Sequence, residues 1–319
     1  MPLAVRGWFI LALLLAAAPQ AAGAAGLEGD LLGAPSRHVV VEGETLVDLA
    51  RRYDLGFVEL RAANREADDW APAAGTRLVL PTAHLLPEAP RQGIVINLAE
   101  LRLYYFDPAG PLVTFPIGIG AEGWETPVGQ TRVVGKREHP TWTPPASIRA
   151  ERPDLPAQIP PGPDNPLGDY ALDLGWRSYL LHGTNKPDGV GRRVSHGCIR
   201  LYPEDIAWLF PRVAVGTPVT VVDQPVKVGW SADALYLEVH PTQRQADAIE
   251  ANEPVAPEPA TDLDWRVQRA AGAAAGRLDW PLIRQIAAER RGVPVRAGPV
   301  RPAAAADHPF GRPRYLRSD

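Results

Sequence analysis

The stretch Ser195-His196-Gly197-Cys198-Ile199-Arg200 holds the one cysteine of this 319-residue chain. Upstream of it, His182-Gly183-Thr184 follows the apolar run Tyr179-Leu180-Leu181, which predicts a strand. The cysteine therefore lies in a polar, glycine-containing segment, whereas structural cysteines are usually small buried apolar residues. His182 ends a rigid element, so we expect its side chain to point across the intervening loop toward Cys198.

These residue types suit a cysteine nucleophile. An unperturbed thiol has a pKa of about 8.5, so a catalytic thiol needs a neighbour that favours its ionised form. Either His182 or His196 can supply an imidazolium for a thiolate–imidazolium pair, and Arg200 is the candidate neighbouring cation. Gly197 lacks a Cβ, so a substrate can approach the thiol and the N–H groups of Gly197 and Cys198 can face a developing oxyanion.

The same residues allow two other interpretations. A lone cysteine is more often a small buried apolar residue than a nucleophile. His182, His196 and Cys198 are also suitable zinc ligands, but they lack a fourth ligand at the usual spacing. A single cysteine excludes an intramolecular disulfide framework and any CxxC motif. The residues thus favour a cysteine enzyme over a structural cysteine or a zinc site.

The segment around this constellation, about residues 93–222, is rich in predicted strands. Residues 94–98 and 101–106 predict a hairpin, and glycine- and proline-rich turns separate further strands at 112–119, 131–135, 170–174, 178–181 and 219–222. Few helical patterns intervene, which favours a β-sandwich or barrel over a parallel α/β sheet. One short helix follows Tyr202, with Pro203 at its first position and Pro211 after its end.

A smaller unit precedes it, at about residues 38–81. Residues 39–41 predict a strand, and Thr45-Leu46-Val47-Asp48 is typical of a helix start in which Thr45 caps the first turn. A second short helix is predicted at 57–64, and a strand at 76–80 closes the unit. The order is βααβ in fewer than 50 residues, which is small for an enzyme and indicates a separate module, for binding or as a structural spacer, beside the larger mainly β domain.

The N-terminus indicates where the protein acts. Residues 1–24 combine Arg6, a short apolar stretch and the small-residue sequence Ala22-Gly23-Ala24, which is typical of a cleaved secretory signal peptide. No later stretch is apolar for the ~18 residues that a membrane helix needs. The net charge of −4, with only three lysines among 33 basic residues, gives no reason to expect a nucleic-acid partner.

The C-terminal third is the least informative part. Residues 223–252 predict a small β extension with one strand at 235–239, and residues 253–259 predict a proline-rich linker. A helix is expected at 281–291, with Gly292 at its C-terminal end. Beyond about residue 295, proline, alanine and arginine dominate, so the remainder of residues 253–319 is expected to be a disordered tail.

The motif around the cysteine resembles a known family. His182-Gly183-Thr184 followed by Ser195-His196-Gly197-Cys198-Ile199-Arg200-Leu201 is similar to the signature of the L,D-transpeptidase (YkuD-type) catalytic domain, of the periplasmic ErfK/YbiS-like branch. Pro116-Ile117-Gly118-Ile119-Gly120 and Thr126-Pro127-Val128-Gly129 extend the resemblance upstream. Val41-Glu42-Gly43-Glu44-Thr45-Leu46 and Leu78-Val79-Leu80-Pro81 resemble a LysM module, which binds the glycan of cell walls.

The resemblance implies roles for particular positions. Cys198 matches the nucleophile and His182 matches the histidine that activates it. Gly183 matches the residue whose main-chain carbonyl orients that imidazole. Further matches are expected to line the pocket, with the chemical roles of His196 and Arg200 left open: Thr184, Ser195, His196, Gly197 and Arg200. The proline-rich insert at residues 151–168 is expected to shape the mouth of the cleft.

The family reaction gives an expected function. Enzymes of this family attack the bond after the third residue, usually diaminopimelate, of a peptidoglycan tetrapeptide stem, release D-Ala and form an acyl-thioester that an amine acceptor resolves. The resemblance implies the same reaction here, with no metal and no organic cofactor. That acceptor is a neighbouring stem, giving a 3-3 cross-link, or a wall-anchored lipoprotein, whereas water would make the enzyme an L,D-carboxypeptidase. A catalytically degenerate wall-binding protein is the remaining alternative, and the presence of both His182 and Cys198 argues against it.

Overall fold

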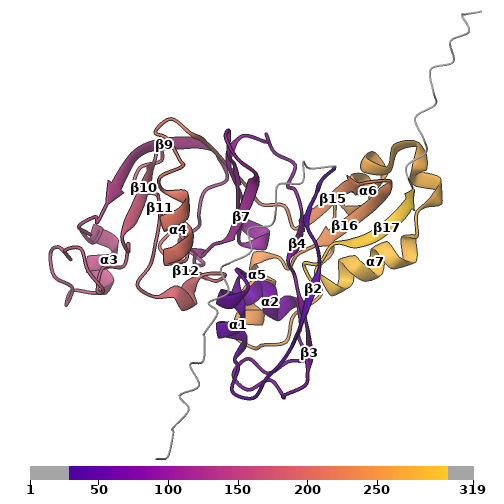
Figure 1. Cartoon of the computed structure of the whole chain (residues 1–319), viewed down its shortest axis with the longest axis horizontal. Helices are drawn as coiled ribbons and strands as arrows, with labels where there is room; N and C mark the ends of the chain where they lie inside the picture. The colour runs from indigo at the N-terminus through magenta and orange to yellow at the C-terminus, as the bar shows by residue number, and fades with distance from the viewer. Residues whose placement is uncertain (1–28, 301–319) are drawn as a thin grey trace, which may run out of the picture.

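The computed structural model describes residues 29–300, which form three units (Figure 1). A small unit of two helices and two strands comes first, a large sheet follows, and a unit of three strands and several helices ends the chain. The predicted signal peptide at residues 1–24 and the last part of the predicted tail, residues 301–319, lie outside the described residues. In the described part, no helix is long and apolar enough to span a membrane.

The central unit is one curled sheet of eight strands in the order β13-β11-β10-β9-β14-β5-β6-β7. Two neighbouring pairs, β11 with β13 and β14 with β5, are parallel, and the other neighbours are antiparallel. The mainly β fold predicted for the catalytic domain is confirmed. The strands are β5 Gly93–Asn97, β6 Arg102–Phe106, β7 Leu112–Pro116, β9 Gly129–Glu138, β10 Tyr170–Leu174, β11 Leu180–His182, β13 Ile199–Arg200 and β14 Pro218–Val222.

One face of this sheet packs on the helix α4, Pro203–Leu209. Leu172, Leu181 and Ile199 are fully buried on that face and share a core with Ile206 of the helix. Lys136 of β9 reaches over the same face, where its Nζ donates to the carbonyl oxygens of Phe210 at 2.6 Å and Val213 at 2.7 Å. The helix starts at Pro203 as predicted, because the missing N–H of proline costs nothing in a first helical turn.

The first unit has the predicted βααβ order. Strand β2, Ser36–Val39, pairs with β3, Arg77–Leu80, and encloses α1, Leu46–Arg52, and α2, Phe57–Ala63. The Thr45 hydroxyl accepts from the Asp48 N–H at 3.1 Å, as the predicted helix start requires. The first strand was predicted too late in the chain, at 39–41. The chain turns there instead, because the Glu44 N–H donates to the Val41 carbonyl.

The C-terminal unit is more ordered than predicted. Strands β15, Val226–Ser231, β16, Ala234–Val239, and β17, Val295–Val300, form an antiparallel sheet. The predicted helix is present as α7, Trp280–Glu289, but α5, Gln243–Glu250, and α6, Leu263–Ala271, were not predicted. The expectation of a tail from about residue 295 is wrong for residues 295–300, because β17 gains its hydrogen bonds from β16, some 60 residues away in sequence.

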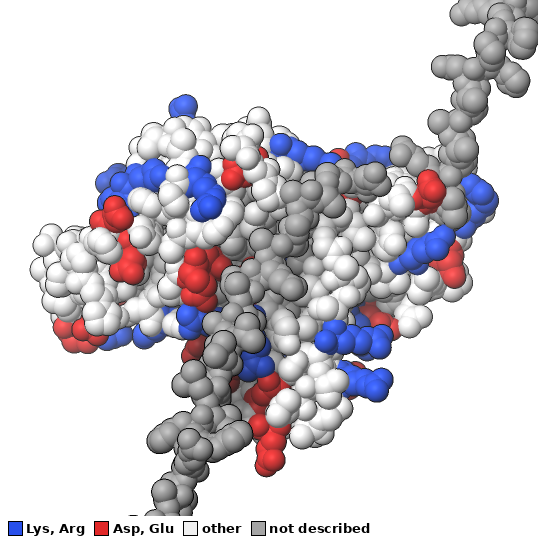
Figure 2. Space-filling model, viewed as in Figure 1, with Lys and Arg blue, Asp and Glu red and all other residues white. Residues whose placement is uncertain are grey.

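The short elements connect these units. Strand β1 pairs with β4, and β8 pairs with β12. The chain continues from β12 into residues 195–198, which we call the cysteine loop. Acidic and basic side chains are interspersed on the visible face in Figure 2, in keeping with the small net charge. The bounds are β1 Leu31–Gly33, β4 Ala83–Leu85, β8 Ile119–Gly120, α3 Ala146–Glu151 and β12 Arg193–Ser195, with 3₁₀ turns at Leu98–Glu100, Pro187–Gly189 and Gly272–Arg277.

The first unit packs directly on the central one. Gly191 has φ +74°, and a Cβ there would lie 2.2 Å from the Cα of Gly56, so two glycines make this contact possible. Beside it, the Arg192 guanidinium lies 3.7 Å from the ring centre of Phe57. The Tyr202 hydroxyl donates to the Leu55 carbonyl at 3.2 Å. The apolar residues of the two units form one continuous core.

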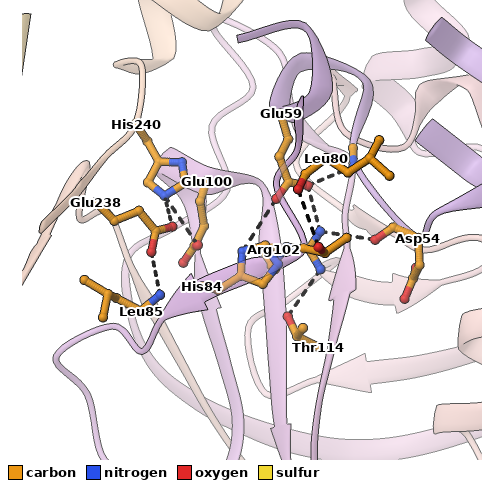
Figure 3. A network of polar contacts seen from close by, with 12 residues as sticks. Asp54, Glu59, Leu80, His84, Leu85, Glu100, Arg102, Thr114, Glu238 and His240 are labelled. Carbon is orange, nitrogen blue, oxygen red and sulfur yellow. Dashed lines mark hydrogen bonds and ion pairs between the residues drawn. The ribbon is translucent and has the colours of Figure 1, made fainter. Parts of the chain in front are cut away.

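A buried network of charged side chains joins all three units (Figure 3). We call it the junction network; it comprises Lys227 and six residues that Figure 3 labels, Glu59, His84, Glu100, Arg102, Glu238 and His240. Arg102 of β6 donates to Glu59 of α2 at 2.7 Å. Lys227 of β15 donates to Glu100 at 2.5 Å and lies 3.0 Å from Glu238. Each charge has a partner of opposite sign, as burial requires.

Replacement of Lys227 by Met should destabilise the whole chain. The substitution leaves Glu100 and Glu238 buried without their cation, and removing one partner of a buried pair costs about 3–5 kcal/mol. The measurement is the urea midpoint of unfolding of the chain without its predicted signal peptide, followed by circular dichroism. Arg152→Met is the matched control, because Arg152 and Asp154 are both exposed and its midpoint should not move. Equal midpoints for the two variants would contradict a stabilising role of the network.

Candidate active site

Parallel pairing of β11 with β13 brings the two halves of the sequence motif together. Leu181 lies opposite Ile199, and His182 lies opposite Arg200. The Leu201 N–H donates to the His182 carbonyl at 2.9 Å and continues the pairing by one residue. His182 is the last residue of β11, as predicted, and Cys198 comes immediately before β13. The sheet therefore sets the positions of both residues.

The tautomer of His182 follows from its hydrogen bond. Its Nδ1 lies 2.5 Å from the carbonyl oxygen of Gly183, and a carbonyl can only accept, so Nδ1 carries the proton. The other ring nitrogen, Nε2, then has a free lone pair. Burial lowers the pKa of His182 to about 3, and the positive charge of Arg200 acts in the same direction. His182 is thus a neutral base at physiological pH.

Cys198 differs from the expectation of a resting thiolate. Its Sγ donates to the carbonyl oxygen of Ser178 at 3.5 Å. Burial raises the pKa of the thiol, although the N–H of Leu180 and the charge of Arg200 act against this. Burial therefore disfavours both members of the predicted thiolate–imidazolium pair in the resting protein. These shifts favour a neutral thiol and a neutral imidazole.

The cysteine loop is held by hydroxyl groups. The Ser195 Oγ donates to the Cys198 carbonyl at 2.6 Å and accepts from the Gly197 N–H at 3.1 Å. The Thr126 Oγ1 donates to the Gly197 carbonyl at 2.9 Å. Gly197 has φ +97°, and a Cβ would lie 2.8 Å from the Tyr179 ring. This position requires glycine on two independent grounds.

These contacts narrow the expected oxyanion site. The Gly197 N–H is already bonded to Ser195, so it does not face a substrate in this conformation. No partner for the Cys198 N–H is found among residues 29–300. Thr184 has a local role, since its Oγ1 accepts from the Lys186 N–H at 2.9 Å and shapes the turn after His182. Of the N–H groups of Gly197 and Cys198, only that of Cys198 is therefore available to donate to an oxyanion.

His196 points to a different partner. Its Nε2 lies 2.9 Å from Glu151 at the end of α3, and its ring lies 4.7 Å from that of Trp124. The zinc interpretation of His182, His196 and Cys198 finds no support here, because His196 pairs with a carboxylate and His182 with a carbonyl. His196 thus connects the cysteine loop to α3, at the start of the proline-rich insert.

Arg200 lies near His182 and Cys198 and forms no ion pair in the described region. It aligns with His182 across the parallel strands, and its Nε is buried with no hydrogen-bond partner there. Burial lowers the pKa of the Arg200 guanidinium, and its charge lowers the pKa of both His182 and Cys198. Arg200 therefore acts on the site through its electrostatic field.

Several contributing residues were missed from the sequence. Thr126 and Trp124 come from the loop after β8, Ser178 and Tyr179 from the turn before β11, and Glu151 from α3. The stretch Thr126-Pro127-Val128-Gly129 carried a signal, because it contributed to the family resemblance. The others have no local pattern, since tertiary packing alone brings them to the cysteine loop.

One cluster in the described region has metal-ligating side chains at suitable spacing, but it lies in the junction network. His84, Glu100 and Glu238 each place a ligand atom within 4.8 Å of the others. The Lys227 ammonium already donates to Glu100 and to the Leu85 carbonyl, at 2.5 and 2.6 Å. It neutralises the carboxylates that a metal ion would need, so the cluster fits a buried ion pair better than a metal site.

A buried histidine with one fixed tautomer and a thiol on a glycine-containing loop, both positioned by the pairing of β11 with β13, are the groups that a cysteine enzyme uses. Comparison with known families agrees with the geometry. Residues 91–221 match the YkuD L,D-transpeptidase catalytic domain, and residues 38–81 match the LysM domain. This combination of domains indicates a protein that binds and processes peptidoglycan.

Similar proteins extend the match beyond the catalytic domain. The probable L,D-transpeptidase YbiS of Escherichia coli is 41% identical over 276 residues, which cover 83% of this chain and 88% of the relative. The probable L,D-transpeptidase YcfS of the same species is 48% identical over 221 residues, covering 66% of this chain and 69% of the relative. The chain belongs to the L,D-transpeptidase family, and it is an L,D-transpeptidase with an N-terminal LysM domain.

The pKa shifts predict how Cys198 reacts with iodoacetamide. Burial raises its pKa and keeps His182 neutral down to about pH 3, so the alkylation rate should rise continuously between pH 6 and 9. Intact-protein mass spectrometry reports this site alone, because the chain has one cysteine, and Cys198→Ser should take up no label. A rate that reaches a plateau below pH 7 would show instead that the resting protein holds a thiolate–imidazolium pair.

Proposed function

We propose that this chain is a periplasmic enzyme that acylates Cys198 with a peptidoglycan stem and transfers the acyl group to an amine. The observation that carries the proposal is the Nδ1–H of His182 bonded to the Gly183 carbonyl, because it directs the basic Nε2 away from the backbone. The family membership supplies the substrate class, a tetrapeptide stem with diaminopimelate at its third position. The predicted signal peptide at residues 1–24 supports export.

The acylation step uses the neutral pair directly. His182 Nε2 takes the thiol proton while the Cys198 sulfur attacks the diaminopimelate carbonyl carbon. The negative charge on the carbonyl oxygen is accepted by the Cys198 N–H, which has no partner in the described part of the chain. The C–N bond to D-Ala then breaks, its nitrogen takes the proton from the His182 imidazolium, and a thioester remains on Cys198.

The second step reverses the first with a new amine. The acceptor nitrogen attacks the thioester, gives one proton to His182, and the proton returns to the Cys198 sulfur as the thioester breaks. A diaminopimelate amine of a neighbouring stem gives a 3-3 cross-link, a lipoprotein lysine gives a wall anchor, and water gives a tripeptide. A charged imidazolium must form transiently in a buried site, so the burial that depresses the pKa of His182 also makes it a ready proton donor.

The LysM domain is proposed to hold the enzyme on glycan strands. It packs on the central unit through Gly56 and Gly191, so bound glycan would keep a fixed position relative to the site. The proposed partners are glycan strands and stem peptides, and a wall-anchored lipoprotein is the alternative amine acceptor. These roles place the chain in cell wall biogenesis.

Product analysis should separate the acceptors. The exported chain is incubated with purified tetrapeptide muropeptides alone, or together with a peptide that ends in lysine as a lipoprotein tail does. We expect release of D-Ala and an amine-linked product, whereas Cys198→Ala should lower turnover by at least about a thousandfold. Ser178→Ala is the matched control, because Ser178 contacts the thiol only through its main-chain carbonyl. Release of tripeptide alone would replace transpeptidation by carboxypeptidation, and no release of D-Ala would refute the proposal.

A further inference from the structure

The sheet places a second arginine on the face that carries His182. Arg137 of β9 lies opposite Ala171 of β10, and Ala171 lies opposite His182 of β11. Residues directly opposite each other on neighbouring strands point to the same face of a sheet. Arg200 of β13 completes the row. Four adjacent strands therefore carry a row on the face opposite α4, with His182 and Arg200 at one end and Arg137 at the other.

The pairing of β9 with β10 explains how Arg137 reaches this face. The register of this pair shifts between Asp173 and Leu174. Because of this shift, Val133 points into the core, whereas Arg137 points to the opposite face, which carries His182. Ala171 is the only residue between Arg137 and His182 in the row, and it contributes just a methyl group. The charge of Arg137 accordingly lowers the pKa of both His182 and Cys198.

The Arg137 guanidinium is held in place with donors to spare. Its Nε and Nη2 donate to the two carboxylate oxygens of Asp173, at 3.1 and 2.7 Å. Gly135 makes room for this pair, because a Cβ there would lie 2.9 Å from the Asp173 carboxylate. The side chain of Arg137 is 39% exposed, and no partner for its Nη1 is found in the described region. A guanidinium that is held in one orientation and still has N–H groups available is suited to bind a carboxylate.

We propose that Arg137 is a specificity residue that binds the side-chain carboxylate of diaminopimelate in the donor stem. This inference rests on the proposed function. Neighbouring strands lie about 4.8 Å apart, so the backbones of Arg137 and His182 are roughly 10 Å apart. The side-chain carboxylate lies at the far end of the residue that supplies the scissile carbonyl. The carboxylate of the leaving D-Ala lies close to the scissile bond, so it cannot reach Arg137 while that bond is at His182.

Binding measured without turnover tests the proposal. Calorimetry is done on Cys198→Ala chains with three stems: the free acid, the stem amidated on the diaminopimelate side chain, and the stem amidated on the glutamate. The Cys198→Ala chain should bind the free acid about tenfold or more tightly than the diaminopimelate amide. Adding Arg137→Gln should abolish this preference, and Arg137→Lys should retain part of it because the charge remains.

The controls make each outcome decisive. Arg244→Gln removes an exposed arginine of the C-terminal unit and should leave the preference unchanged. An equal loss of affinity for all three stems in the Arg137→Gln chain, or a preference that follows the glutamate carboxylate, would overturn the proposal. If the proposed function itself is wrong, the product analysis with muropeptides would show it, because the chain with Cys198 and Arg137 intact would release no D-Ala.

Discussion

The parallel pairing of β11 with β13 is the constraint on which the site depends. Only two residue pairs align, yet they bring His182 beside the residues that follow Cys198. Alternation along the strands then divides the side chains between two faces. Leu181 and Ile199 enter the core against α4, whereas His182 and Arg200 lie on the opposite face. The buried pair Leu181 and Ile199 thereby fixes the register that the chemistry requires.

Burial of the site has a chemical consequence. It favours the neutral forms of both His182 and Cys198, so the resting site avoids the cost of two desolvated charges. The base is nevertheless oriented, because the Gly183 carbonyl holds its tautomer without an acidic side chain. Such a site ionises only as the substrate reacts. A thiol that stays neutral is also less prone to oxidation, which proceeds mainly through the thiolate.

Local patterns predicted what local physics determines. The cap of α1 by Thr45, the proline at the start of α4 and the strand ending at His182 were all predicted from neighbouring residues. The motif also indicated Cys198 and His182 as the central pair. The sequence did not indicate the contact of His196 with Glu151, the hydroxyl of Thr126 on the Gly197 carbonyl, or the pairing of β16 with β17. These contacts join distant segments, so no window of sequence contains both partners.

The ionisation state of the site cannot be predicted from residue types for a related reason. Residue types suggested a thiolate–imidazolium pair, but the degree of burial decides whether such a pair forms, and burial is a property of the whole fold. The junction network likewise depends on burial that only the complete fold creates. Lys227, Glu100 and Arg102 look like surface charges in the sequence, and they become a buried tie between units once the sheet, the LysM domain and the C-terminal unit meet.

Trapping the acyl-enzyme tests the central claim most directly. The chain without its predicted signal peptide is mixed with a tetrapeptide stem, quenched in acid within seconds, and analysed by intact and peptide-level mass spectrometry. The account predicts a gain equal to the tripeptide acyl group, located on Cys198 and absent when His182 is replaced by Ala. Acylation of another residue, or equal acylation of Cys198 without His182, would contradict it.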